Sequence, residues 1–458
     1  MKRYVLLFLS ILAAAGQYVL SAENISGPWH GKIDVGGTRL TLVLRFGTDS
    51  LGNAACTLDS PDQGALGIPA QVLLLRDDSV SVSVPSLKAA FQGRFVQEGQ
   101  ERRLTGTFSQ VWMRFPLTLQ PGEPVRNRPQ EPQPPYPYRT EEVRFVNESD
   151  GVTLAGTLTW PEKFREGMAP VVLMVTGSGT QNRDEEILGH KPFLVLADFL
   201  ARNGIASLRY DDRGAGESDR GDGPVTTESN MRDALAGMEY LRGLGQFGKA
   251  GVLGHSEGGA VAFMLGARKA VDFVVSMSGP GMRGDSILVE QNRLMLAGTG
   301  IAPVYVDGYC RVLGGILEMK TEGRVVADPA ALVDSLAAAV GAEALPSNMT
   351  SNLAAVWDAL DDPWSMQFIQ YSPIEDIART DCPVMALGGS LDLQVPPANA
   401  EGIRRHLPDG KHNIVKIYPG LNHLFQHCKT GTVQEYGVIE ETVSPEVLSD
   451  IAEWINSL

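Results

Sequence analysis

Positive charge is scarce in this 458-residue sequence. Lysine and arginine together number 39, against 54 aspartate and glutamate residues, which gives a formal net charge of −15. The sequence also has no run rich in lysine and arginine that could offset this balance. Because the phosphate backbone of a nucleic acid would be repelled, these features argue against a nucleic-acid-binding protein.

Cysteines and long apolar runs are also few. The four cysteines (Cys56, Cys310, Cys382 and Cys428) are scattered and have no metal-ligand spacing. A disulfide between Cys382 and Cys428 is conceivable, and inert thiols are the other reading. Beyond the first residues, no stretch reaches the roughly 20 apolar residues of a membrane span. We therefore expect no bound metal, no other cofactor and no stable membrane insertion of the processed chain.

The first residues have the pattern of a signal peptide. Lys2 and Arg3 precede an apolar run over residues 4–15, and small residues follow at 13–15 and again at 21–22. We predict a signal peptide over residues 1–22 with two candidate cleavage sites, and export to the periplasm or the extracellular space. An N-terminal anchor that is not cleaved is the alternative.

Residues 24–120 predict a small all-β domain. Segments 41–46 and 79–84 alternate apolar and polar residues, and clusters of glycine, aspartate and asparagine separate such runs. Seven or eight short strands without a helix indicate an antiparallel sandwich or barrel. Trp29 and Trp112 are expected in its core. Substrate docking, cell-wall attachment and dimerisation are all open as its role.

A cluster of prolines marks residues 121–140 as a linker. Seven prolines lie between positions 121 and 137, and proline favours an extended backbone without an N–H donor. We expect a semi-rigid linker between two domains, or a segment laid along the surface of one of them.

Residues 141–458 have the alternating pattern of an α/β domain. A hairpin over 142–159 is followed by short apolar runs at 171–176, 205–210, 251–254, 273–278, 384–387 and 413–418, with helix-period stretches between them. Such runs are typical of buried parallel strands, so we predict a doubly wound, mostly parallel sheet. The mainly helical interval 281–371 interrupts the alternation and is predicted to be a lid. Pro329 suits the first turn of one of its helices.

Ser256 is the candidate nucleophile. It lies in Gly254-His255-Ser256-Glu257-Gly258, which fits G-x-S-x-G between a predicted strand and a predicted helix. Glycines on both sides permit the strained turn that lifts the hydroxyl clear of the sheet, at a helix N-terminus that favours negative charge. His255, next to it, is expected to face elsewhere on the turn.

His423 is the candidate base, because a serine hydroxyl attacks well only when a neighbouring base takes its proton. It follows the strand at 413–418, at the edge where α/β sheets gather their site residues. His427 lies four residues further on, a spacing at which His423 and His427 could bind one metal ion together, but the sequence offers no third ligand.

Asp392 is the candidate acid that orients the base. It follows the strand at 384–387 in Gly388-Gly389-Ser390-Leu391-Asp392, about 30 residues before His423. Asp285, after the preceding strand, is the competing candidate. The order serine, aspartate, histidine is the one used by the α/β-hydrolase fold.

Two backbone N–H groups are expected to stabilise the oxyanion that forms during acyl transfer. One is the amide of Glu257, directly after the nucleophile. The other is assigned to Ser178 in the loop after the strand at 171–176, with Gly179 as the next candidate.

These motifs together resemble a bacterial α/β-hydrolase. The residues that carry the resemblance are the hairpin, Thr176–Gly179 with Arg183-Asp184, the segment 210–218, Gly254–Gly259, Asp392 and His423. The nearest branch is serine-aminopeptidase-like and includes secreted carboxylesterases with an N-terminal β domain. The resemblance covers residues 141–458 and implies ester hydrolysis through an acyl-enzyme. The 210–218 segment is interpreted as a structural turn beside the site.

Three functions follow from this reading. The first is a serine carboxylesterase acting on short or medium acyl esters. The second is an aminopeptidase or dipeptidyl-peptidase-like enzyme with the same triad, which needs a lid carboxylate such as Glu290 or Glu318 to hold the substrate's ammonium. The third is a catalytically silent binding module. The expected partner is a small ester or peptide substrate, and the sequence predicts no oligomeric state.

Overall fold

The structure is a computed structural model that describes residues 25–36, 38–49, 51–63, 65–76, 78–98, 101–124, 127–342 and 345–458. The predicted signal peptide, residues 1–22, lies outside the described residues. The chain divides into two compact units, Met1–Arg126 and Asn127–Leu458, and each is described by itself.

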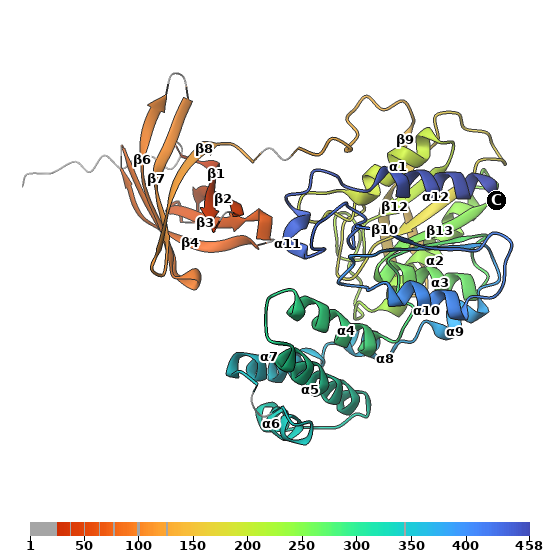
Figure 1. Cartoon of the computed structure of the whole chain (residues 1–458). Coiled ribbons are helices and arrows are strands. Elements are labelled where there is room, and N and C mark those ends of the chain that lie inside the picture. The colour runs from red at the N-terminus through yellow and green to blue at the C-terminus, as the bar shows by residue number, and fades with distance from the viewer. Residues whose placement is uncertain are drawn as a thin grey trace, which may run out of the picture. The chain divides into compact units, whose positions relative to one another are not determined.

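The first unit is a closed eight-stranded antiparallel barrel (Figure 1). Each strand pairs with the next along the chain, and β1 closes the barrel by pairing with β8. The strands are β1 (Gly27–Val35), β2 (Thr38–Thr48), β3 (Ala54–Ser60), β4 (Ala65–Arg76), β5 (Ser79–Val84), β6 (Ala89–Glu98), β7 (Glu101–Gln110) and β8 (Met113–Pro121).

Alternation of apolar and polar residues builds the barrel core. In β5 the valines at 80, 82 and 84 are buried and the intervening serines are not. Trp29 is buried in this core as expected, with 4% of its surface exposed. The expectation for Trp112 is wrong, because 84% of its surface is exposed. It stands in the tight turn between β7 and β8, beside Val111 with its φ of +56°, and a residue in such a turn has no inward face.

The second unit contains an eight-stranded, mostly parallel sheet in the order β16-β15-β14-β13-β11-β12-β10-β9. β9 and β10, the first two strands of this unit along the chain, form the antiparallel hairpin, and β10 also pairs antiparallel with β12. The strands are β9 (Thr140–Asn147), β10 (Val152–Thr159), β11 (Val171–Val175), β12 (Ala206–Tyr210), β13 (Ala250–His255), β14 (Val274–Met277), β15 (Val384–Gly389) and β16 (Ile414–Tyr418).

Helices cover both faces of this sheet, which makes three layers (Figure 1). In β11, Val171, Leu173 and Val175 pack into one core cluster, while Val172 and Met174 pack into the other. A strand buried on both sides reads as a continuous apolar run for this reason. One face carries α2 (Thr227–Gly243), α3 (Glu257–Ala267), α9 (Ile374–Arg379) and α10 (Ala398–His406), and the other carries α1 (Pro192–Arg202) and α12 (Pro445–Ser457).

The interval predicted as a lid is helical and has a hydrophobic cluster of its own. Pro329 opens one helix as expected, with the Asp328 side chain accepting from the amides of Ala330 and Ala331. The helices of this interval are α4 (Gly284–Ala297), α5 (Pro303–Thr321), α6 (Pro329–Ala339), α7 (Ser347–Ala359) and α8 (Pro363–Gln370). The short α11 (Val433–Tyr436) follows β16.

The second half of the proline-rich segment packs on the α/β unit. The Arg128 guanidinium donates to the carbonyls of Gly189, Ile439 and Gly437 at 2.7–3.0 Å. Gln130 donates to the Val443 carbonyl and accepts from the Thr442 amide. From Asn127 onward this segment is therefore part of the α/β unit.

Candidate active site

Ser256 lies in the sharp turn between β13 and α3. Its φ of +52° is a backbone conformation that a residue with a side chain rarely adopts. The turn depends on its glycines: a Cβ on Gly254 would overlap the Gly258 carbonyl, and a Cβ on Gly258 would overlap the Val175 carbonyl. This close packing around the glycines therefore holds Ser256 at the N-terminus of an 11-residue helix, whose dipole favours negative charge.

His423 lies in the loop after β16, which its neighbour Asn422 stabilises. The Asn422 side chain accepts from the amides of Leu424 at 3.0 Å and Gln426 at 2.9 Å. The imidazole itself is buried, and its Nδ1 lies 2.8 Å from Oδ2 of Asp392.

Asp392 is 1% exposed and uses its two oxygens differently. Oδ1 accepts from the amides of Gln394 at 2.9 Å and Val395 at 2.8 Å, while Oδ2 faces His423. A carboxylate against Nδ1 keeps the proton there, so Nε2 is the nitrogen left to accept one.

The competing residues do not join this arrangement. Asp285 lies on α4, where its carboxylate pairs with Arg283 and accepts from Ser286. His427 pairs with Glu441, and its side chain is largely exposed. Among the described residues, no group of three or more histidines, cysteines, aspartates or glutamates could hold a metal ion.

A cavity of about 400 Å³ brings the candidate residues together. Ser178, Ser256, Glu257 and His423 all line it, whereas Gly179 is not among its lining residues. None of the described residues that line it is a lysine or arginine. Most of the remaining lining residues are apolar and come largely from the lid: Ile187, Ile287, Leu288, Val356, Leu360, Trp364, Phe368, Ile369, Val395 and Leu424.

The loop after β11 is held by two buried carboxyl groups. Asp212 accepts from the hydroxyl of Thr176 and the amide of Gln181, each at 2.9 Å. Burial raises the pKa of Asp212 to about 8, although these hydrogen bonds oppose the shift. Glu185 accepts from the amide of Gly177 at 2.8 Å.

Sequence reasoning missed the role of Glu257's side chain. The buried carboxylate accepts from Thr227 Oγ1 at 2.5 Å and from Trp364 Nε1 at 2.9 Å. Burial raises its pKa, against the hydrogen bonds of Thr227, Trp364 and Ser178. Since Trp364 belongs to α8, this hydrogen bond ties the predicted lid to α3, the helix that follows Ser256. The sequence carries no signal that would pair these two residues.

Three further expectations are corrected or refined. His255 was expected to face elsewhere on the turn, but it lines the cavity and its ring centroid lies 4.7 Å from that of His423. Glu290 and Glu318 are not among the residues that line the cavity; Glu290 pairs with Arg293 on α4, and Glu318 lies on α5. The acidic lining residues are Glu185 and Glu257 instead.

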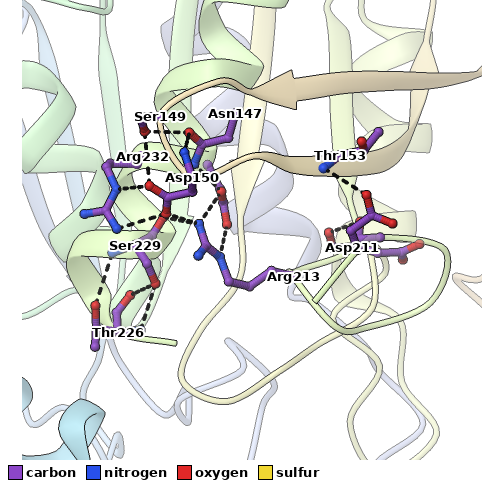
Figure 2. A network of polar contacts seen from close by, with 12 residues as sticks. Asn147, Ser149, Asp150, Thr153, Asp211, Arg213, Thr226, Ser229 and Arg232 are labelled. Atoms are coloured by element: carbon purple, nitrogen blue, oxygen red, sulfur yellow. Dashed lines mark hydrogen bonds and ion pairs between the residues drawn. The ribbon is translucent and has the colours of Figure 1, made fainter. Parts of the chain in front are cut away.

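The 210–218 segment forms a structural network beside β12 (Figure 2). The buried Arg213 guanidinium donates to Asp233 of α2 at 2.6 and 2.7 Å and to Asp150 of the β9–β10 turn at 2.8 Å. Arg232 also donates to Asp150. These ion pairs fix the loop after β12 against the hairpin and α2.

Comparison with known proteins agrees with this architecture. A family model described as "Serine aminopeptidase, S33" matches residues 191–307, which include the serine turn. Esterase EstD of Thermotoga maritima is 24% identical over 303 residues, which cover 66% of this chain and 65% of EstD, slightly less than two thirds of its length.

Solved structures with similarity to the chain include esterases and a peptidase. The Pyrococcus furiosus esterase Pf2001 has a TM-score of 0.41 at 17% identity and covers 73% of this chain and 99% of its own. Proline iminopeptidase of Mycobacterium smegmatis has a TM-score of 0.42 at 14% identity, covering 69% and 98%. Est1E of Butyrivibrio proteoclasticus, bound to ferulic acid, has a TM-score of 0.40 at 15% identity, covering 69% and 98%.

The fold is that of an α/β-hydrolase preceded by an all-β barrel domain. The family model and the sequence relative are both those of hydrolases, a serine aminopeptidase family and an esterase. No helix in the described ranges has the length and apolarity needed to span a membrane.

Proposed function

We propose that this α/β-hydrolase is a serine hydrolase that cleaves carboxylic esters of short or medium acyl groups. The observation that carries the proposal is that His423 lines the same cavity as Ser256 on its strained turn, while its Nδ1 lies 2.8 Å from Oδ2 of the buried Asp392. Esterase EstD, the relative described above, supports the same class.

The proposed reaction has two halves. The Ser256 hydroxyl attacks the ester carbonyl carbon while Nε2 of His423 takes its proton, and Asp392 stabilises the imidazolium. The tetrahedral intermediate then expels the alcohol, which receives that proton, and leaves an acyl-serine. A water molecule attacks the acyl-serine in the same way, which releases the acid and restores the hydroxyl.

The backbone amides of Glu257 and Ser178 are the proposed hydrogen-bond donors to the oxyanion. The amide of Gly177 already donates to Glu185 at 2.8 Å, which favours its neighbour Ser178 as the donor from this loop. The apolar lid side chains and the lack of lysine or arginine in the cavity lining favour an uncharged acyl chain.

The family description favours a second candidate, an aminopeptidase with the same catalytic residues. Such an enzyme needs a carboxylate to hold a substrate ammonium. The two acidic lining residues already accept hydrogen bonds from Gly177, Thr227 and Trp364, which supports the ester as substrate.

The test is the Ser256→Ala variant with p-nitrophenyl butyrate. We expect turnover to fall to the uncatalysed background and labelling by a fluorophosphonate to disappear, while the circular dichroism spectrum is unchanged. Persistent turnover in the variant would contradict the mechanism. Faster hydrolysis of aminoacyl-naphthylamides than of nitrophenyl esters by the wild type would favour the peptidase, and a wild type that neither reacts nor labels would favour a silent binding module.

A further inference from the structure

Glu185 and His255 form a buried pair directly beside the candidate base. Only 2% of Glu185 and 6% of His255 are exposed, and Nδ1 of His255 lies 2.8 Å from Oε1 of Glu185. The other ring nitrogen, Nε2, lies 2.9 Å from the carbonyl oxygen of His423. A carbonyl oxygen only accepts hydrogen bonds, so Nε2 must carry a hydrogen.

The second ring nitrogen also carries a hydrogen. Oε1 of Glu185 accepts from the Gly177 amide at 2.8 Å as well as facing His255, which suits an ionised carboxylate. Burial lowers the pKa of His255, but the charge and hydrogen bond of Glu185, the hydrogen bond to the His423 backbone and the charge of Asp392 together outweigh burial, so the pKa is raised. The raised pKa favours the form of His255 in which both ring nitrogens carry a hydrogen and donate to these two neighbours.

Other ionisable groups surround the pair from three loops. Asp392 and His423 face it from the loops after β15 and β16. Asp212, from the loop after β12, acts on it through Glu185, whose charge contributes to the raised pKa of Asp212. Any pH dependence of the pair has to be separated from the titration of Asp212.

The backbone of Glu185 is held in an unfavourable conformation. Its φ is +52°, in the left-handed region that a residue with a side chain rarely adopts. Such strain persists only where the surroundings enforce it, and it is found more often at functional sites. Here the conformation accompanies a side chain that meets both Gly177 and His255.

We propose that Glu185 and His255 are positioning residues for the ester hydrolysis proposed above, on which this inference rests. Their hydrogen bonds connect the amide of Gly177, beside the oxyanion donor Ser178, to the carbonyl of His423. The pair thereby fixes the distance between the oxyanion loop and the base on the two sides of Ser256. Neither residue exchanges a proton with the substrate.

The test compares Glu185→Gln and His255→Gln with the wild type on p-nitrophenyl butyrate. In Glu185→Gln the side-chain oxygen can still accept from the Gly177 amide, but the neutral side chain no longer raises the pKa of His255 by its charge. We expect kcat to fall by about 10- to 100-fold in each variant while KM stays within about threefold, because small displacements of reacting groups cost this much. Active sites are counted by fluorophosphonate labelling, so that unfolded protein does not lower the apparent kcat.

The pH profile gives a readout that a structural role would not change. In the wild type, loss of a His255 proton above its raised pKa removes one donated hydrogen bond, so kcat should fall on the alkaline side. His255→Gln should lack this alkaline fall, and Asp212→Asn should keep it.

Asp233→Asn provides a matched control, because Asp233 also belongs to a buried ion pair, with Arg213, but does not line the cavity. It should lower the unfolding temperature and leave kcat per labelled site within about twofold of the wild type. The proposed positioning role of Glu185 and His255 is contradicted if both test variants keep kcat per labelled site within twofold of the wild-type value. A wild type that neither hydrolyses the ester nor labels would overturn the proposed function, and this inference with it.

Discussion

At the scale of single residues, the orientation of the candidate base depends on one oxygen atom. Oδ1 of Asp392 is occupied by two backbone amides, and only Oδ2 meets His423. An asparagine in this place could keep the first two hydrogen bonds, but its NH₂ group would meet Nδ1 and so favour the wrong tautomer of the imidazole.

We therefore expect Asp392→Asn to fold normally and to lose about 1,000- to 10,000-fold in kcat on p-nitrophenyl butyrate. Steady-state kinetics and thermal unfolding measure the two effects. Asp285→Asn is the control, since the Asp285 carboxylate pairs with Arg283 and not with His423, and its kcat should stay near that of the wild type. Equal losses in the two variants would argue against the assignment of Asp392.

Asp212 gives a second prediction, on stability. Its folded-state pKa of about 8 lies above the ordinary value near 3.8, because burial penalises the charged form. Between these values the folded chain keeps a proton that the unfolded chain releases, so this group's contribution to stability falls as pH rises. Asp212→Asn has no such proton to lose.

The free energy of unfolding of Asp212→Asn, relative to the wild type, should therefore increase from pH 5 to pH 8. Urea unfolding at a series of pH values measures it. A difference that stays constant with pH would show that Asp212 titrates normally.

Residues that directly follow strands could be read from the sequence, and others could not. Ser256, Asp392 and His423 each come after a short apolar run, and parallel strands bring the ends of such runs to one edge. Glu185 directly follows Arg183-Asp184, which carry part of the resemblance to α/β-hydrolases. Its contacts with Gly177 and His255 depend on the path of a loop that has no periodic pattern. Trp112 was misplaced because a turn of two residues removed it from the alternation that buries Trp29.

At the scale of elements, the helical interval predicted as a lid supplies much of the cavity lining. Val356 and Leu360 of the α7 region and Trp364 and Phe368 of α8 form much of the cavity wall. The sequence located this interval and its helical character, because it interrupts a regular alternation. It did not show which faces of the helices line the cavity beside Ser256, since that depends on packing between helices.

Val356→Trp should fill part of the cavity and select against long chains. We expect the ratio of kcat/KM for p-nitrophenyl octanoate to that for the acetate to fall by about tenfold. Ala355→Trp, on the same helix with an exposed side chain that does not line the cavity, is the matched control. An unchanged ratio in Val356→Trp would place the acyl chain elsewhere.

At the scale of the whole molecule, the chain consists of two units, each with a hydrophobic core of its own. The composition change at the prolines indicated two units, and the barrel is one of the two architectures expected from strand count alone. Export, which was predicted from residues 1–22, stays a prediction. The role of the barrel is likewise open.

The α/β unit should fold and hydrolyse esters without the barrel, provided that its proline-rich segment is kept. A chain beginning at Asn127 should match the full-length kcat, because Arg128 and Gln130 keep their acceptors. A chain beginning at Thr140 loses these hydrogen bonds and that of Tyr138 to Asp198, at about 1 kcal/mol each. Its unfolding temperature should be lower by roughly 5–10 °C in differential scanning calorimetry, and equal unfolding temperatures would show that the segment does not contribute.

The contacts of Arg128 also impose an order on folding during synthesis. Its acceptor carbonyls at Gly437 and Ile439 lie 309 and 311 residues further along the chain. At about 5–20 residues per second, the ribosome needs roughly 15–60 seconds to make that length. The barrel pairs only neighbouring strands and its two ends, so it can close early, whereas these two contacts of Arg128 must wait until residues 437 and 439 have been translated.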